Sequence, residues 1–288
     1  MNKVCLAVMG MAWTIGAQLA FASFADRVVG YQAGTNSAVG YNNPASALGE
    51  PSRVTPGASG GPVDPFNPPF LPAQLVSIGK GGFLTVAFEN PIWDAPGNPF
   101  GRDFIIFGNN GFTITNGDFS GGGVTDGSTF TFDPPGSSRV WVSEDGSLYY
   151  ELVPPDGVMA TVDGLYPTDG SGDFQRPTDP ALTGADFAGL DLAGLRVRYG
   201  GSAGGTSFDL AWARTATGQN AGLGAVRYVR VEVSSGKVEV DGLAVVPEPA
   251  MPALLGLAGG LGLAGWAWRR WQRGPAGRAA QSAAAPPR

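Results

Sequence analysis

The amino-acid sequence predicts an all-β fold, an antiparallel β-sandwich of a jelly-roll-like kind. Apolar and polar residues alternate in many short runs, which is the period of a half-buried strand. The 46 glycines and 24 prolines separate these runs in the way turn residues do. Between the two termini, no stretch keeps a helical period for more than about a dozen residues. We therefore expect a single β core with little helix.

The clearest predicted strand covers residues 83–89, where Leu84, Val86 and Phe88 share one face and Thr85 and Glu89 the other. Similar runs, each bounded by turn residues, predict strands at 103–107, 112–115, 128–132, 139–143, 148–153, 195–199, 208–212, 229–233 and 238–245. About ten short strands separated by turns are typical of an antiparallel sandwich.

Two local features refine this map. Asp145 and Gly146 stand between two alternating runs, and glycine supplies the positive φ that a tight turn needs, so the sequence predicts a hairpin there. Residues 186–195 are the best helical candidate, a single short helix or turn.

The N-terminal segment has the pattern of a secretory signal peptide. Lys3 precedes an uncharged apolar stretch from Val4 to Ala20, and small residues follow at the positions that a signal peptidase requires. Cleavage after Ala22 or Ala25 fits this pattern. We assign residues 1–25 to the signal peptide and 26–246 to the ectodomain. The alternative, a retained membrane anchor, is disfavoured because the apolar run is short.

The C-terminal segment has three parts in a fixed order. Val246-Pro247-Glu248-Pro249 is followed by an uncharged stretch at 250–268, and then by a basic cluster of Arg269, Arg270 and Arg273. Nineteen apolar residues are long enough to span a bilayer as one transmembrane helix, and the arginines would stay on the cytoplasmic side.

This ending closely resembles the PEP-CTERM sorting signal. The resemblance covers residues 247–273 and implies that an exosortase recognises the Pro-Glu-Pro motif and removes the tail. One departure is the Pro/Ala-rich basic tail at 274–288, which we expect to be disordered and which makes the ending longer than usual. An ordinary C-terminal anchor is the alternative interpretation.

Six blocks of the ectodomain carry a second resemblance, at residues 44–51, 76–88, 98–109, 142–146, 228–231 and 239–244. In these blocks the chain looks like a group of bacterial exported surface proteins of unknown function with discoidin-like or jelly-roll sandwiches. The resemblance implies the sandwich fold. It supplies no catalytic residues.

Charge and composition exclude several classes of function. Six of the 18 basic residues lie in the two terminal segments, against Glu248 alone among the 24 acidic residues, so the ectodomain is more acidic than the whole-chain net charge of −6. Nucleic acid is therefore excluded as a partner on electrostatic grounds, whereas divalent cations suit this charge. With Cys5 in the leader and no histidine in the chain, disulfides and common zinc sites are also excluded.

Enzymatic chemistry has little support in the sequence. Residues 200–204 match a nucleophile-elbow pattern, but a chain without histidine cannot complete a Ser-His-acid triad. Six ectodomain glutamates leave a carboxylate-based glycan hydrolase open, although no pairing is visible among Glu50, Glu89, Glu144, Glu151, Glu232 and Glu239.

The segment from Asp163 to Asp179 is the candidate metal site. Its oxygen-bearing side chains are interspersed with glycines, as in the first half of a Ca²⁺ loop: Asp163, Asp169, Ser171, Asp173 and Asp179. No glutamate stands at the twelfth position of a loop that starts at Asp169, which rejects an EF-hand. A solvated turn is the alternative. Ca²⁺ is the one cofactor that the sequence suggests.

Five aromatic residues in loop-like segments suggest a glycan-binding role, namely Trp93, Phe100, Tyr149, Tyr150 and Tyr166. We therefore predict an exported, non-enzymatic surface or matrix protein whose partners are signal peptidase, an exosortase-type enzyme, the inner membrane and extracellular polysaccharide. A carbohydrate-binding adhesion module is the alternative, and a glycan hydrolase is the third.

Overall fold

The computed structural model describes residues 24–58, 60–130 and 136–248. One compact unit of the chain ends at Glu248, and all of the fold below belongs to it. The predicted transmembrane helix at 250–268 and the cluster of Arg269, Arg270 and Arg273 lie outside the described residues, as does nearly all of the predicted signal peptide. No helix in the described ranges has the length and apolar character to cross a membrane.

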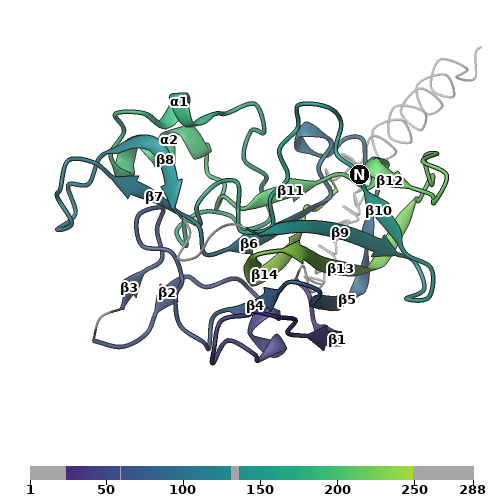
Figure 1. Cartoon of the computed structure of the whole chain (residues 1–288). Helices are drawn as coiled ribbons and strands as arrows, with labels where there is room; N and C mark the ends of the chain where they lie inside the picture. Colours follow the sequence, from purple (N-terminus) through teal and green to yellow (C-terminus); the bar gives the residue numbers. More distant parts are fainter. Residues whose placement is uncertain (1–23, 59, 131–135, 249–288) are drawn as a thin grey trace, which may run out of the picture. The chain divides into compact units, whose positions relative to one another are not determined.

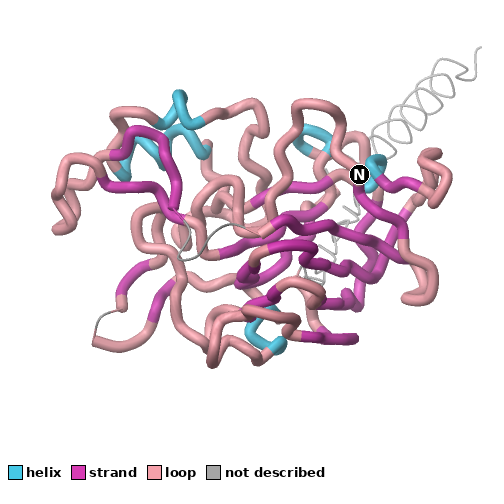
Figure 2. The backbone as a smooth tube through the Cα atoms, in the orientation of Figure 1, coloured by secondary structure: helices cyan, strands magenta, loops and turns pink. Residues whose placement is uncertain are grey.

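The described chain is mostly β, and its strands pair antiparallel, as the sequence predicted (Figures 1 and 2). The larger sheet has six strands, in the order β1 (Arg27–Gln32), β5 (Phe83–Trp93), β13 (Ala225–Ser235), β9 (Ser137–Ser143), β10 (Tyr150–Leu152) and β12 (Ala213–Arg214). The second sheet has four, in the order β11 (Thr206–Phe208), β6 (Phe104–Gly108), β14 (Lys237–Val245) and β4 (Val76–Gly79).

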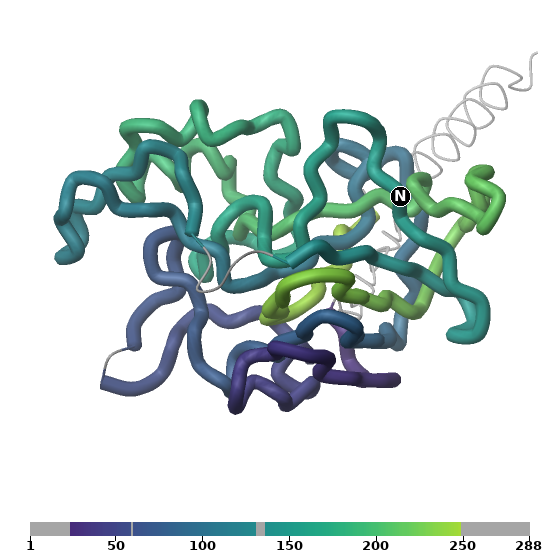
Figure 3. The backbone as a smooth tube through the Cα atoms, in the orientation of Figure 1, coloured from purple at the N-terminus to yellow at the C-terminus, as the bar shows by residue number. Residues whose placement is uncertain are grey.

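The last two strands join the two sheets. β13 pairs with β5 and β9 in the larger sheet, whereas β14 pairs with β6 and β4 in the smaller one. Gly236 alone separates them, with a φ of 64° that favours glycine. Figure 3 shows this yellow-green pair among strands from much earlier in the chain.

The main core lies between these sheets. Along β13 the side chains alternate between buried and less buried positions, and Val229, Val231 and Val233 are the buried set. They share one cluster with Ile106 of β6 and Val240 of β14. Burial of these aliphatic side chains on facing sheets is the largest favourable contribution to the fold, at about 1.5 to 3 kcal/mol for each fully buried side chain.

Shorter elements extend one end of the domain (Figure 1). They are β2 (Val54–Thr55) with β3 (Gly61–Pro62), β7 (Gly111–Ile114) with β8 (Thr125–Phe130), and the helices α1 (Gly184–Phe187) and α2 (Leu192–Tyr199). Three 3-10 turns lie elsewhere in the described chain: η1 (Pro44–Ala47) beside β4 and β14, η2 (Pro99–Gly101) in the connection from β5 to β6, and η3 (Leu210–Trp212) beside β10. A separate aromatic cluster packs beneath α1 and α2, with Phe112, Tyr166, Phe187, Leu195 and Tyr199 buried in it.

The strand predicted at 195–199 is wrong, because this segment belongs to α2. The Asp191 side chain accepts a hydrogen bond from the Gly194 amide at 2.8 Å and caps the helix start. Gly200, with a φ of 60°, ends it. Leu195 and Tyr199 are the buried pair on one face, so a spacing of four residues outweighs the apparent alternation.

Three other local predictions are partly right. The predicted strand at 208–212 is divided between β11, which ends at Phe208, and the 3-10 turn η3. The predicted helix at 186–195 overlaps both α1 and α2, but it does not begin or end where they do, because the chain forms two short helices here. The predicted hairpin is present, since β9 pairs with β10, although β10 begins at Tyr150 rather than at residue 148, so the loop spans residues 144–149. Gly146 has the expected positive φ of 79°.

Candidate functional site

The predicted Ca²⁺ loop contains a buried carboxylate that already has a cationic partner. Asp169 is 1% exposed and receives hydrogen bonds from Arg196 through Nε at 2.8 Å and Nη2 at 3.1 Å. The Ser171 hydroxyl also donates to it, at 2.7 Å. Burial alone would raise the pKa of Asp169, but the hydrogen bonds from Arg196 and Ser171 outweigh burial and lower it.

The three other predicted acidic ligands do not form a cluster with Asp169. Asp163 is buried and accepts a hydrogen bond from the backbone amide of Glu239 at 3.1 Å. Asp173 and Asp179 are exposed, and each accepts a backbone hydrogen bond within its own turn, from Gln175 and Ala181 respectively. The predicted convergence of these oxygens on one cation is not found in the described part of the chain.

Three acids far apart in the sequence do meet. Ligand oxygens of Asp94, Asp103 and Asp209 all lie within 4.8 Å of one another, and no other group of three or more acids among residues 24–58, 60–130 and 136–248 does so. Asp94 follows β5, Asp103 precedes β6 and Asp209 stands between β11 and η3. The sequence analysis missed this cluster, although Asp103 and Asp209 both lie in predicted strands next to turns.

Asp103 is the buried member of the cluster, at 1% exposure. Its Oδ2 accepts a hydrogen bond from the Leu210 amide at 2.8 Å, and its Oδ1 accepts one from the Ala95 amide at 3.2 Å. Burial raises the pKa of Asp103 to about 6, and the neighbouring carboxylates of Asp209 and Asp94 act in the same direction.

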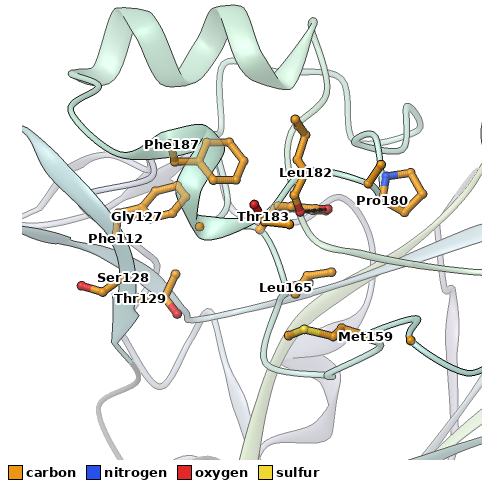
Figure 4. A pocket seen from close by; sticks show the side chains of 14 residues that line it. Phe112, Gly127, Ser128, Thr129, Met159, Leu165, Pro180, Leu182, Thr183 and Phe187 are labelled. Atoms are coloured by element: carbon orange, nitrogen blue, oxygen red, sulfur yellow. Dashed lines mark hydrogen bonds between the residues drawn. The ribbon is translucent and has the colours of Figure 1, made fainter.

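An aromatic cavity of about 490 Å³ lies between β8 and the segment that leads into α1 (Figure 4). In Figure 4 the rings of Phe112 and Phe187 lie together on one side, and Met159 lies on the opposite side. These two rings are 5.0 Å apart between centroids. Met159 is 64% exposed, so an apolar side chain stands at the entrance.

Tyr166 fixes one wall of this cavity. Its hydroxyl donates to the carbonyl oxygens of Asp179 and Leu182 at 2.9 and 3.0 Å, which holds the 179–182 segment in place. Burial raises the pKa of Tyr166 to about 12, so the hydroxyl keeps its proton at neutral pH. On the other wall, a Cβ at Gly127 would lie 1.8 Å from the Gly184 carbonyl oxygen, so only glycine fits.

A second cavity, of about 510 Å³, combines aromatic rings with polar groups. Its lining includes Tyr41, Phe66, Phe70 and Phe130, together with Asn109 and Glu239. The Asn109 amide donates to the Glu239 carboxylate, and both side chains are mostly buried. Rings beside a carboxylate and an amide suit a ligand with an apolar face and hydroxyl groups.

Glu239 is one of the six glutamates considered for hydrolysis, and its nearest acidic neighbour is Asp163. Burial and the neighbouring Glu239 charge raise the pKa of Asp163 to about 7, while the hydrogen bond from the Glu239 amide acts to lower it. Asp163 does not line the cavity, and Glu239 is the one acid among the described lining residues. The described part of the cavity lining thus offers one carboxylate, and glycoside hydrolysis generally uses two.

The five aromatic residues predicted from loops do not share a site. Trp93, the last residue of β5, and Phe100 in η2 are 53% and 51% exposed. Tyr150 packs against the main core, Tyr149 is partly buried, and Tyr166 lines the first cavity. The second cavity uses four rings that the sequence analysis did not select.

The described chain ends inside the predicted sorting motif. Val246 is buried, and its amide donates to the Asp103 carbonyl oxygen at 2.9 Å. Pro247 and Glu248 are exposed, and Pro249 lies outside the described residues. The compact unit therefore ends within the motif, at Glu248.

Comparison with known proteins gives no family for this chain: no protein-family model matches it, and no curated protein does.

Proposed function

We propose that this chain is an exported, non-enzymatic bacterial surface or matrix protein, sorted through its C-terminal Pro-Glu-Pro motif by an exosortase-type enzyme. The observation that carries the proposal is the order of motif, apolar stretch and arginine cluster directly after the last strand. Exposure of Pro247 and Glu248 at the end of a compact unit supports it, because a processing enzyme needs an accessible segment.

The proposed ectodomain is a β-sandwich of a jelly-roll-like kind. Two antiparallel sheets that share one hydrophobic cluster support this assignment. In the proposed route, signal peptidase releases the N-terminus, the 250–268 segment holds the chain in the inner membrane, and sorting delivers the ectodomain to the surface or the extracellular polysaccharide matrix.

The packing of the N-terminal residues favours one of the two signal-peptidase sites. Ala25 is fully buried, and its amide donates to the Leu243 carbonyl oxygen at 3.1 Å. Phe24 forms a bridge with Ala244. Cleavage after Ala25 would remove both contacts, so the proposed mature chain begins at Ser23. Intact-mass measurement of released protein checks this start; a start at Asp26 would refute it.

Substitution of the motif glutamate tests the sorting step. Glu248→Ala is expected to leave the melting temperature unchanged and to make the unprocessed chain accumulate in the membrane fraction. Glu144→Ala removes an equally exposed carboxylate from a loop and is the matched control. Normal release of Glu248→Ala would reject exosortase-type processing and leave an ordinary anchor or another protease.

The second cavity favours a second candidate function, carbohydrate binding for adhesion. Its four rings offer faces for the C–H side of a sugar, and Asn109 and Glu239 offer hydrogen-bonding groups for hydroxyls. A volume of about 510 Å³ is within the range of small-molecule sites. We assign the proposed glycan site to this cavity rather than to the exposed aromatics.

A glycan array with the full chain tests this candidate. Loss of a stacked ring in Phe66→Ala should weaken binding of any retained glycan by about tenfold, which corresponds to about 1.4 kcal/mol. Phe119→Ala, which removes an 80% exposed ring outside the cavity, should bind normally. The absence of any retained glycan would reject adhesion, and release of products from a polysaccharide would identify a hydrolase instead.

A further inference from the structure

The acids Asp94, Asp103 and Asp209 form a cluster whose spacing suits a cation. Two ligands on opposite sides of Ca²⁺ are about 4.8 Å apart, because each bond to oxygen is about 2.4 Å long. All three acids present oxygens within that span of one another. Asp103 is buried, while Asp94 and Asp209 are partly exposed and leave a path from solvent.

Asn98 provides an independent indication of a ligand. The residue is 4% exposed, and its Oδ1 is buried without any hydrogen-bond partner in the described chain. A buried amide oxygen of this kind normally has a partner. Its Nδ2 donates to Asp103 Oδ1 at 3.1 Å, so the amide faces the cluster. Rotation of the side-chain amide by 180° would exchange Nδ2 and Oδ1, so that Oδ1 would face Asp103 in place of Nδ2.

That half turn would bring two oxygens together at a separation of about 3.1 Å. Without a cation between them, the amide oxygen and the carboxylate would repel each other. With Ca²⁺ present, 3.1 Å is an ordinary separation for neighbouring ligands. The unpartnered Oδ1 thus becomes the fourth oxygen ligand, beside the three carboxylates.

The net negative charge of the cluster also favours binding of a divalent cation. Among the described residues, Arg102 is the one basic side chain that forms an ion pair with the cluster, through a contact of 3.9 Å between Nη1 and Asp209 Oδ2. Its guanidinium stacks on the Trp212 ring at 4.3 Å, and its buried Nε has no partner. Three carboxylates with one guanidinium leave two negative charges, while the Asp94 carboxylate accepts no hydrogen bond from described residues.

We propose that Asp94, Asp103, Asp209 and the Asn98 amide oxygen bind one Ca²⁺ ion, with water completing its coordination. All four ligands are oxygens and three are carboxylates, which is the kind of ligand set that Ca²⁺ takes in proteins. The ion would link the loop after β5 to the start of β6 and to the turn after β11. It would thereby join segments from both main sheets.

Calcium titration of the purified full-length chain in mild detergent tests the site. One equivalent of Ca²⁺ is expected to bind, and a hundredfold excess over its dissociation constant should raise the melting temperature by about 5 to 10 °C. Terbium luminescence excited through tryptophan gives a second readout, because Trp93 precedes Asp94.

Asp94→Asn and Asp209→Asn keep the side-chain shape and retain an amide oxygen, so both variants should fold. Each is expected to weaken Ca²⁺ binding at least tenfold. Asp173→Asn and Asp179→Asn alter exposed acids of the 163–179 loop and should bind as the unaltered chain does. The proposal is overturned if the unaltered chain binds no Ca²⁺ at millimolar concentration. Normal binding by both cluster variants, or loss of binding in a loop variant, would also overturn it.

Discussion

Two acidic regions of the described domain neutralise their buried carboxylates in different ways. In the 163–179 loop, the buried carboxylate of Asp169 is paired with the guanidinium of Arg196 at 2.8 Å. In the cluster of Asp94, Asp103 and Asp209, the one paired arginine, Arg102, reaches an acid at 3.9 Å. The buried acid of the loop is therefore paired with an arginine of α2, whereas the cluster keeps an excess of negative charge.

This difference shows why acid density along a chain is a poor guide to a metal site. The loop places four aspartates within seventeen residues, yet their oxygens point to separate partners. The cluster draws its acids from two connections, with Asp94 and Asp103 at the two ends of the β5–β6 connection and Asp209 after β11, which the sheet topology brings together. An unsatisfied buried oxygen beside the acids is the more informative signal, since buried polar atoms rarely lack a partner.

The largest expected effect is on stability in the loop. Asp169→Ala should lower the free energy of unfolding by about 2 to 4 kcal/mol, because it removes a buried carboxylate and leaves Arg196 without its partner. Asp173→Ala, at an exposed position of the same loop, should change it by less than about 0.5 kcal/mol. Urea unfolding measures both. Equal free energies of unfolding in the two variants would contradict the stabilising role assigned to the Asp169–Arg196 pair.

The pH dependence of stability separates Asp163 from Asp169 within the loop. The pKa of Asp163 is raised to about 7 in the folded chain, against an ordinary value of 3.8. The folded chain therefore keeps this proton between pH 4 and 7 while the unfolded chain loses it. The contribution of protonated Asp163 to the free energy of unfolding is therefore complete below pH 3.8 and is lost as the pH rises through 7.

Asp163→Asn removes this titration and keeps an oxygen that can accept the Glu239 amide hydrogen. Between pH 5 and 6, the free energy of unfolding of the variant should rise relative to the unaltered chain by about 1.4 kcal/mol per pH unit. Asp173→Asn is the control and should follow the unaltered chain. Parallel curves for Asp163→Asn and the unaltered chain would mean that Asp163 is ionised across this range.

The smallest effect concerns the arginine of the cluster. Arg102→Gln removes the positive charge beside Asp209, so the cluster should bind Ca²⁺ about fivefold more tightly, which corresponds to about 1 kcal/mol of charge interaction in a solvated site. Arg196→Gln should leave the affinity unchanged because its partner, Asp169, belongs to the other region. Titration calorimetry measures both. Weaker binding in Arg102→Gln would contradict the charge balance described for the cluster.

The sequence predicted the sheets better than the site. The alternation in Phe83–Glu89 and Val229–Val233 identified strands of the larger sheet, because the alternating apolar residues of each pack into the core, although Thr85 and Ala87 on the other face of β5 are buried as well. Alternation failed at 195–199, where an Asp191 cap and a Gly200 end favour a helix. The acid cluster and the Glu239 cavity depend on strand order and on contacts across more than a hundred residues, which local patterns do not encode.

The most direct test is to locate the bound ion, either at the cluster of Asp94, Asp103 and Asp209 or in the 163–179 loop. Crystals of the chain grown with Tb³⁺ in place of Ca²⁺ would locate it by anomalous scattering. We expect one strong peak about 2.3 to 2.6 Å from oxygens of Asp94, Asp103 and Asp209, with the Asn98 amide turned to present Oδ1. A strong peak among Asp163, Asp169, Asp173 and Asp179, with none at the cluster, would contradict it.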